Sequence, residues 1–98
     1  MSLTSKQKRH LRALAHKLKP VVMVGNAGLS EGVIGEIDGS LAHHELIKVR
    51  LGGMGRDDRT AAIEEVCRKT ASELVGSIGH IGIFYRASEQ KLIPLPKA

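Results

Sequence analysis

The chain has 98 residues, of which 42% are hydrophobic, and it carries a formal net charge of +5 with an isoelectric point near 9.7. This length fits one domain spanning residues 1–98 and leaves little room for a second. No apolar run approaches the roughly 20 residues of a membrane span, and the charged N-terminus is not followed by the apolar segment of a signal peptide. The single cysteine, Cys67, cannot form an internal disulfide, so we expect a cytoplasmic protein in a reducing compartment.

Positive charge is concentrated at the N-terminal end of the chain. The first 30 residues contain six basic and no acidic residues, whereas the remaining 68 contain nine basic and ten acidic ones. Interspersed signs are typical of a solubilising surface, but this one-sided distribution favours a polyanionic partner, which we interpret as nucleic acid. The basic residues of this segment are Lys6, Lys8, Arg9, Arg12, Lys17 and Lys19.

The first predicted element is a helix over residues 4–18. Thr4 and Gln7 fit a capping box at its start, and Pro20 ends it, because the residue before a proline disfavours helical angles. Residues 21–24 form a short apolar run without alternation, which predicts a strand buried on both faces. The helix has an apolar face made of Leu11, Leu14, Ala15 and Leu18.

A glycine loop separates this strand from a second helix, predicted over residues 31–43. Ser30 is a suitable N-cap. One face of this helix carries Val33, Ile34, Ile37 and Leu41. The opposite face carries three glycines at positions 32, 35 and 39, which should weaken the helix by roughly 1 kcal/mol each relative to alanine.

The second half predicts one more helix and three more strands. Residues 46–51 alternate as a strand, with Ile47, Val49 and Leu51 on one face and Leu46, Lys48 and Arg50 on the other. A helix over 58–75 begins at Asp57 or Asp58 and ends near Gly76. Strands over 81–86 and 92–95 form an antiparallel hairpin, with Pro94 on an edge strand. The order α-β-α-β-α-β-β predicts a two-layer α/β fold with a four-stranded mixed sheet.

The glycine loop comprises Gly25, Asn26, Ala27 and Gly28. A loop that enters a helix N-terminus favours anions, because the first helical amides are unpaired, and glycine lets a ligand approach the backbone. A nucleotide-binding P-loop is excluded because no lysine follows Gly28, and the dinucleotide pattern is excluded because position 23 is methionine. A tight strand-to-helix turn and a backbone clamp like that of KH domains both fit G-x-x-G. The basic run upstream favours the clamp.

Other polar residues give weaker signals. Lys48 and Arg50 share a strand face that either extends the basic surface or is merely solvated. His43 and His44 are interpreted as helix C-terminal residues, and they form no cluster that predicts a metal site. No side-chain set predicts a catalytic site, and no cofactor is expected. With one phenylalanine and one tyrosine, we expect recognition of structured RNA through its backbone and shape rather than by stacking of bases on aromatic rings.

The stretch "LKPVVMVGNAGLSEGVIGEIDGSLAHHELIKVRL" resembles the core of the CRM domain, the chloroplast RNA splicing and ribosome maturation domain. With "LTSKQKRHLRALAHK" and "YRASEQKLIPLP", the whole chain is similar to the stand-alone bacterial YhbY family. The resemblance implies an RNA-binding fold similar to the C-terminal domain of translation initiation factor 3. It also implies association with precursors of the large ribosomal subunit, with residues 25–28 as the RNA-contacting loop.

These observations together predict an RNA-binding monomer, not an enzyme, that assists ribosome assembly. Its expected partners are 23S rRNA or its precursor and pre-50S particles. Two alternatives remain, a protein-interaction module that uses the glycine-striped second helix and an enzyme with a phosphate ligand. The expected RNA-binding residues are Gly25, Asn26, Ala27, Gly28, Lys6, Arg9, Arg12, Lys17, Lys19, Lys48 and Arg50.

Overall fold

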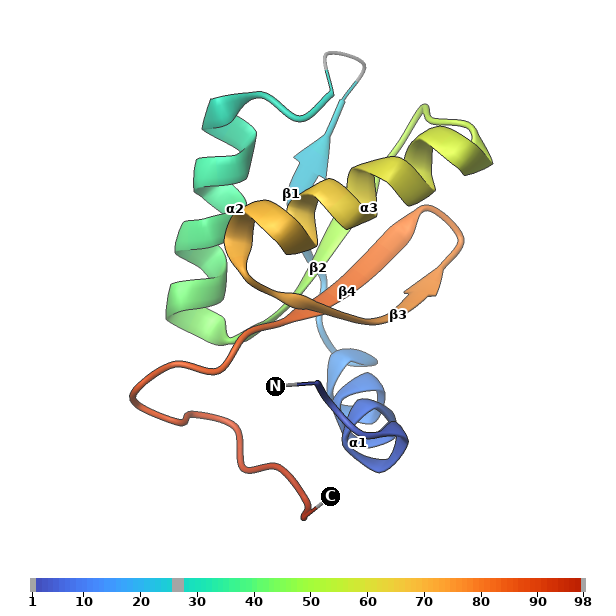
Figure 1. Cartoon of the computed structure of the whole chain (residues 1–98). Helices are drawn as coiled ribbons and strands as arrows, with labels where there is room; N and C mark the ends of the chain where they lie inside the picture. The colour runs from blue at the N-terminus through green and yellow to red at the C-terminus, as the bar shows by residue number, and fades with distance from the viewer. Residues whose placement is uncertain (1, 26–27, 98) are drawn as a thin grey trace.

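The structure is a computed structural model that describes residues 2–25 and 28–97. Asn26 and Ala27, the middle of the predicted glycine loop, lie outside these residues. The order of elements is the predicted α-β-α-β-α-β-β (Figure 1). Their bounds are α1 Ser5–Ala15, β1 Pro20–Val24, α2 Glu31–His44, β2 Leu46–Leu51, α3 Arg56–Thr70, β3 Glu73–Ile78 and β4 Ile81–Tyr85.

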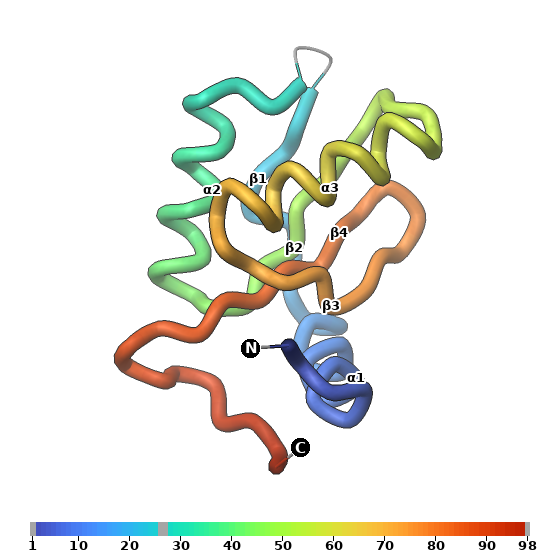
Figure 2. Tube along the Cα trace, in the orientation of Figure 1, coloured from blue at the N-terminus to red at the C-terminus, as the bar shows by residue number. Residues whose placement is uncertain are grey.

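The four strands form one mixed sheet in the order β1-β2-β4-β3, which confirms the predicted number of strands and the mixed character of the sheet. β1 and β2 are parallel and are connected through α2, as a strand-helix-strand crossover requires. β4 lies between β2 and β3 and is antiparallel to both. The path of the chain through this sheet can be followed in Figure 2.

Both faces of the sheet are covered by helices, which differs from the predicted two layers. On one face, α2 and α3 pack on a core that includes Val24, Val49 and Phe84. On the other face, α1 packs on a second cluster that includes Leu46 and Ile83. The two clusters use alternate residues of the same strands because successive side chains point to opposite faces. The α1 layer covers only part of its face, and this leaves strand side chains exposed there.

The prediction that β1 is buried on both faces is wrong. β1 is an edge strand whose burial alternates. Val22 and Val24 point into the core beneath α2 and α3. Val21 and Met23 point to the other face and are 48% and 71% exposed. An apolar run of four residues does not distinguish a strand buried on both faces from an edge strand buried on one face, since both are commonly rich in β-branched side chains.

The first helix has the predicted start and an earlier end. The Thr4 hydroxyl accepts a hydrogen bond from the amide of Gln7, and the Gln7 side chain accepts one from the amide of Thr4, which confirms the capping box. The helix ends at Ala15 rather than at residue 18. Beyond it, the carbonyl of Leu18 accepts a hydrogen bond from Nζ of Lys48, which holds this connection on the sheet as the chain turns into β1.

The predicted end of the third helix and the predicted fourth strand are both wrong. α3 begins after Gly55 and not at Asp57 or Asp58, and it ends at Thr70 because Ala71 adopts a left-handed φ of 53°. Residues 73–75, predicted in this helix, and Gly76, predicted at its cap, belong to β3, which covers Glu73–Ile78. Residues 92–95 form no strand, so the antiparallel hairpin is β3–β4.

The C-terminal segment after β4 is held by one buried carboxylate. Glu45, between α2 and β2, is fully buried. Its Oε2 accepts hydrogen bonds from the amides of Ser88 and Leu92, each at 3.0 Å, and from the Ser88 hydroxyl, and its Oε1 accepts one from the amide of Ile93 at 3.0 Å. Burial acts to raise the pKa of Glu45, but these hydrogen bonds outweigh it and lower the pKa. Glu45 is therefore the anchor of residues 88–93.

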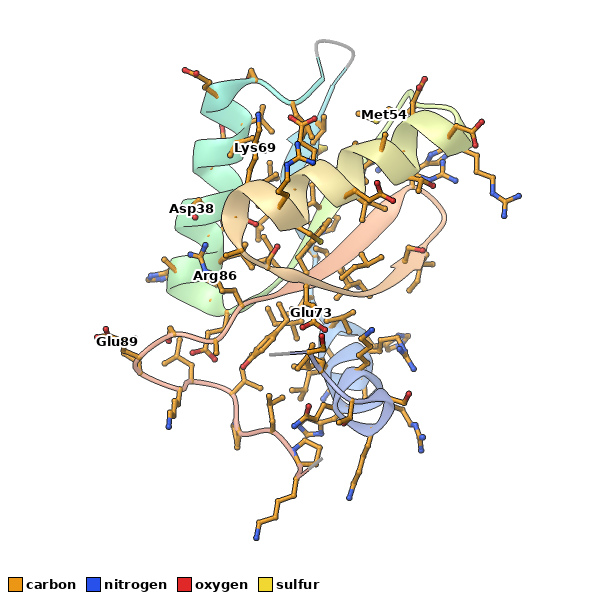
Figure 3. All side chains as sticks on the ribbon, in the orientation of Figure 1. Asp38, Met54, Lys69, Glu73, Arg86 and Glu89 are labelled. Atoms are coloured by element: carbon orange, nitrogen blue, oxygen red, sulfur yellow. The ribbon has the colours of Figure 1, made fainter. Side chains whose placement is uncertain are left out.

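Arg86 connects the two helices on the core side of the sheet. Its Nη1 donates to Oδ1 of Asp38 in α2 at 2.6 Å and to the carbonyl of Thr70, the last residue of α3, at 2.7 Å. Figure 3 shows Arg86 directed at Asp38. This contact ties the segment after β4 to the middle of α2 and to the end of α3.

Candidate nucleic-acid interface

The predicted basic surface is centred on α1. Lys6 and Arg9 are exposed on this helix, and Lys17 and Lys19 are exposed between it and β1. The helix carries no acidic residue, so neighbouring side chains on α1 do not neutralise its charge. Four of the predicted contact residues are thus available to a polyanion on one side of the molecule.

Two of the predicted contact residues, Lys48 and Arg12, donate hydrogen bonds to backbone carbonyls within the fold. Lys48 is only 9% exposed, and its Nζ donates to the carbonyl of Leu18 at 3.0 Å. Arg12 donates from Nη1 to the carbonyl of Val75 at 3.1 Å. The stem of Arg12 also packs on Gly76, where an added Cβ would come within 2.8 Å of the Arg12 Cδ. The structure therefore gives both residues packing roles, and their charges add to the field of this face.

Arg50 lies on the same face as α1 and is exposed. It pairs across the sheet with Met23 of β1 and Ile81 of β4. The alternation within β2 puts it on the side of Leu46 and Lys48, which both lie beneath α1 or its C-terminal connection. Arg50 thus extends the basic surface beyond the helix, toward the carboxyl end of β1.

The sheet separates the two signs of charge. α2 and α3 together carry seven acidic and four basic residues. The other face, with α1 and its connection, carries eight basic residues, and Glu73 is the one acidic residue contributed to it by the strands. Both carboxylate oxygens of Glu73 accept hydrogen bonds from the Leu3 amide. The one-sided charge of the sequence therefore becomes a basic and an acidic face of the fold.

The glycine loop follows the carboxyl end of β1 and enters α2. Gly28 has a φ of +78°, which disfavours any other residue, and its amide donates to the carbonyl of Gly25 at 3.0 Å. The Ser30 hydroxyl accepts a hydrogen bond from the amide of Val33, which confirms the predicted N-cap. The amides of Gly28 and Val33 are used within the chain. Glu31 and Gly32 are in the first turn of α2, where backbone amides have no acceptor within the helix, so a phosphate contact at this end would use their amides.

The loop and α1 lie at opposite ends of β1. In Figure 1 the carboxyl end of β1 and the start of α2 are at one end of the molecule, and α1 is at the other. The seven residues from Lys19 to Gly25 span about 20 Å in extended form. The structure thus places Gly25 and Gly28 apart from Lys6 and Arg9, and a single ligand that contacts both regions has to follow β1.

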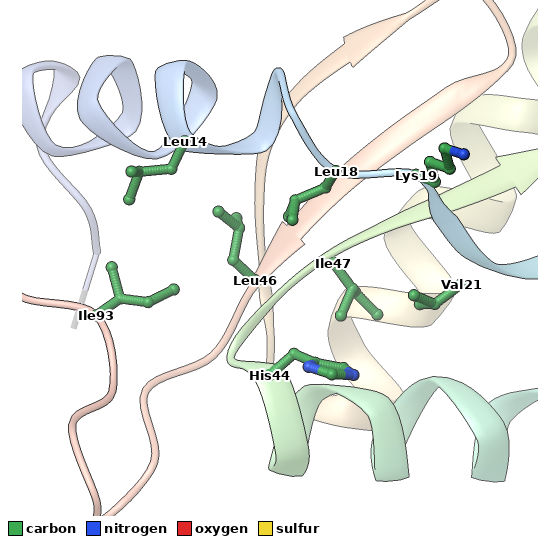
Figure 4. A pocket seen from close by; sticks show the side chains of 8 residues that line it. All are labelled: Leu14, Leu18, Lys19, Val21, His44, Leu46, Ile47 and Ile93. Carbon is green, nitrogen blue, oxygen red and sulfur yellow. The ribbon is translucent and has the colours of Figure 1, made fainter.

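Two concave regions bear on the alternative of a phosphate-binding enzyme. A groove between α1, the start of β1 and the end of α2 is lined by apolar side chains such as Leu14 and Leu46, with His44 at its side (Figure 4). A shallow hollow beside Gly28 is lined by Met54, Asp58 and Glu65. The first offers few polar groups, and the carboxylates of the second repel phosphate, so neither fits a phosphoryl substrate.

In residues 2–25 and 28–97, histidine, cysteine and acidic side chains form no group of three that could hold a metal ion. No helix in these ranges is long and apolar enough to span a membrane. Cys67 is half-buried, and burial raises the pKa of its thiol, which disfavours the reactive thiolate.

An α/β domain with a basic helix on one sheet face and a glycine loop after β1 is the arrangement expected for the CRM domain. A family model described as CRS1 / YhbY (CRM) domain matches residues 3–86. The chain therefore belongs to the CRM family.

Individual relatives agree with this assignment. An RNA-binding protein of Haemophilus influenzae is 48% identical over 96 residues, which cover 98% of this chain and 97% of the relative. The probable RNA-binding protein YqeI of Bacillus subtilis is 39% identical over 95 residues, covering 96% and 99%. The solution structure of a hypothetical Staphylococcus aureus protein, described as a candidate RNA-binding protein, is similar with a TM-score of 0.84 at 44% identity and covers 97% of this chain and 100% of that one.

Proposed function

We propose that the chain is a single RNA-binding domain that associates with precursors of the large ribosomal subunit and assists their assembly. The observation that carries this proposal is the separation of charge across the sheet, with eight basic residues on the α1 face. A polyanion is attracted to that face and repelled from the other. Relatives named as RNA-binding proteins support RNA as this polyanion.

The proposed mechanism has two contacts. Lys6, Arg9, Lys17 and Lys19 attract the RNA backbone by releasing condensed counterions. The glycine loop then holds a phosphate with the first amides of α2. Neither contact requires chemistry on the RNA, so the protein acts by holding an rRNA conformation and not by catalysis.

The contribution of the loop is tested by changing charge at Gly25. An added Cβ at this position meets no atom within 4 Å, and its φ lies outside the left-handed region that makes Gly28 hard to replace. Gly25→Asp is expected to weaken binding to a structured rRNA fragment about tenfold by repelling phosphate. Gly25→Ala and Gly25→Lys, which add a side chain without negative charge, are expected to stay within about twofold of the parent. Equal affinities for all three variants would remove the loop from the mechanism.

The ribosomal assignment is tested by ultraviolet crosslinking in cells, followed by sequencing of the bound RNA. We expect enrichment of 23S rRNA precursors, with sites grouped in one region of the pre-50S particle. A library dominated by scattered messenger RNA would contradict the ribosomal role while leaving RNA binding intact.

The alternative of a protein-interaction module relies on the exposed face of α2. The glycines at 32, 35 and 39 are exposed there. A Cβ added at Gly35 or Gly39 would meet no other atom within 4 Å, so a partner can approach the backbone at these two positions. Beyond its first turn this helix carries Glu36 and Asp38, so that part of its surface does not suit RNA. Binding through this face would be nearly independent of salt, unlike binding through the α1 face.

A further inference from the structure

One row of side chains crosses all four strands on the α1 face beyond the helix. Met23 pairs with Arg50, Arg50 with Ile81, and Ile81 with Ile78. α1 covers the other half of this face, where its contacts include Leu46 and Ile83. The row is therefore uncovered, and Met23 and Ile78 at its two ends are 71% and 61% exposed.

Such exposure is unusual on the open face of a sheet. Strand side chains that face water are commonly polar, and large apolar ones gathered in one place are typical of a contact surface. Arg50 lies within the row, and the strands contribute no acidic residue beside it on this half of the face. The surface combines apolar side chains with one planar cation and lies within the basic field of α1.

The position of the row suggests what covers it. Met23 is two residues before the glycine loop, whereas the exposed basic residues of α1 are at the other end of β1. RNA that contacts both regions has to follow β1, so it passes over Met23 and the neighbouring Arg50 at one end of the row, with the rest of the row open beside it. This distance of about 20 Å corresponds to about six stacked nucleotides at roughly 3.4 Å each.

The chemistry of the row distinguishes paired from unpaired RNA. A duplex would press hydrated phosphates and ribose hydroxyls against Met23 and Ile78, which offer them no hydrogen bonds. An unpaired strand can turn the flat faces of its bases toward these side chains and stack a base on the guanidinium of Arg50. The apolar side chains of the row suit the faces of unpaired bases, and Arg50 suits their charged backbone, so the row favours an unpaired segment over a duplex.

We propose that the row Met23, Arg50, Ile81 and Ile78 is a docking site for unpaired nucleotides of the bound RNA. This proposal rests on the proposed RNA-binding function and adds to it the kind of RNA that is recognised. The protein reads a single-stranded segment on the sheet, while α1 holds the RNA backbone beside it.

The test uses the full chain and two RNA probes in fluorescence anisotropy titrations. One probe is an unstructured strand of about 12 nucleotides, twice the estimated span, and the other is a duplex of the same length. The double variant Met23→Thr, Ile78→Thr keeps side chains that suit strands but removes most of the apolar contact. We expect it to bind the single strand about tenfold more weakly and the duplex within about twofold of the parent. The slope of log affinity against log salt should not change.

The control variant is Leu92→Thr, which replaces an apolar residue of comparable exposure in the C-terminal segment. We expect its affinity for both probes to equal that of the parent. Thermal unfolding of all variants verifies that the domain is folded, which the exposure of both substituted residues favours.

The outcomes separate this proposal from the proposed function. If the parent binds neither probe, RNA binding itself is contradicted. If the parent binds and the double variant binds both probes equally well, or loses both to the same degree, the sheet row is not a site for unpaired nucleotides, although RNA binding stands. If the parent sediments as a dimer and the variant as a monomer with unchanged RNA affinity, the row is covered by a second copy of the chain, and the proposal is wrong.

Discussion

Replacing Lys6, Arg9 and Lys17 together by glutamine is expected to weaken binding to structured rRNA about 100-fold at physiological salt. All three side chains are exposed, and none of their charges is neutralised by an acidic residue on α1. If each contacts one phosphate, the slope of log affinity against log salt falls by roughly two to three units. Arg12 is left unchanged because its hydrogen bond to Val75 would make a loss of affinity ambiguous.

The matched control removes the same number of charges from the other face. The triple variant Arg56→Gln, Arg68→Gln, Lys69→Gln changes exposed side chains of α3, where acidic neighbours surround them. Its salt slope is expected to change by less than about one unit, since these residues contact no phosphate in the proposed complex. Titrations between low and high salt measure both slopes. If the two triple variants flatten the slope equally, net charge alone drives binding and α1 does not face the RNA.

The second large effect is on stability. Replacing Glu45 by alanine leaves three amides and one hydroxyl without their acceptor, so the free energy of unfolding is expected to fall by about 3–5 kcal/mol. Glu45→Gln keeps one acceptor oxygen and should lose about half as much. Glu89→Gln, in the same segment but exposed, should have no measurable effect. Urea unfolding of the three variants checks these values, and an alanine variant as stable as the parent would show that residues 88–93 are not anchored by this carboxylate.

The same carboxylate makes stability depend on pH. The pKa of Glu45 lies below its ordinary value of 4.5 in the folded protein. The unfolded chain therefore binds a proton more readily than the folded one, and the stabilisation is complete above about pH 5 and is lost as the pH falls through and below 4.5. The difference in stability between the parent and Glu45→Gln should shrink over this acidic range. A constant difference would mean that ionisation of Glu45 does not contribute.

Local signals were sufficient to predict the first half of the fold. The capping box at Thr4, the N-cap at Ser30 and the alternation of residues 46–51 each define an element through contacts within a few residues, and all three are confirmed. The one-sided charge of the first 30 residues likewise became a face of the structure, because α1 and its connection stay on one side of the sheet.

The errors lie where distant contacts decide the structure. The sequence around Thr70 continues the helical pattern, and α3 ends there because Ala71 turns into a left-handed conformation and β3 pairs with β4. Whether β1 lies at the edge or the centre of the sheet depends on strand order, which residues 21–24 do not encode. The buried roles of Lys48 and Glu45 depend on partners 30 and 43–48 residues away. Alternation in the second strand placed Arg50 on one face with Lys48, but only the sheet register shows that Met23 and Ile78 share that face.

The anchoring of the C-terminal segment by Glu45 has a consequence for synthesis of the chain. Glu45 is translated 43 to 48 residues before the groups that satisfy it. Until residues 88–93 have left the exit tunnel, the site that buries this carboxylate lacks all four of its donors, and the charge remains in water. The region where α2 meets β2 can therefore close only after residues 88–93 are available, so the domain does not complete its fold progressively from its N-terminus.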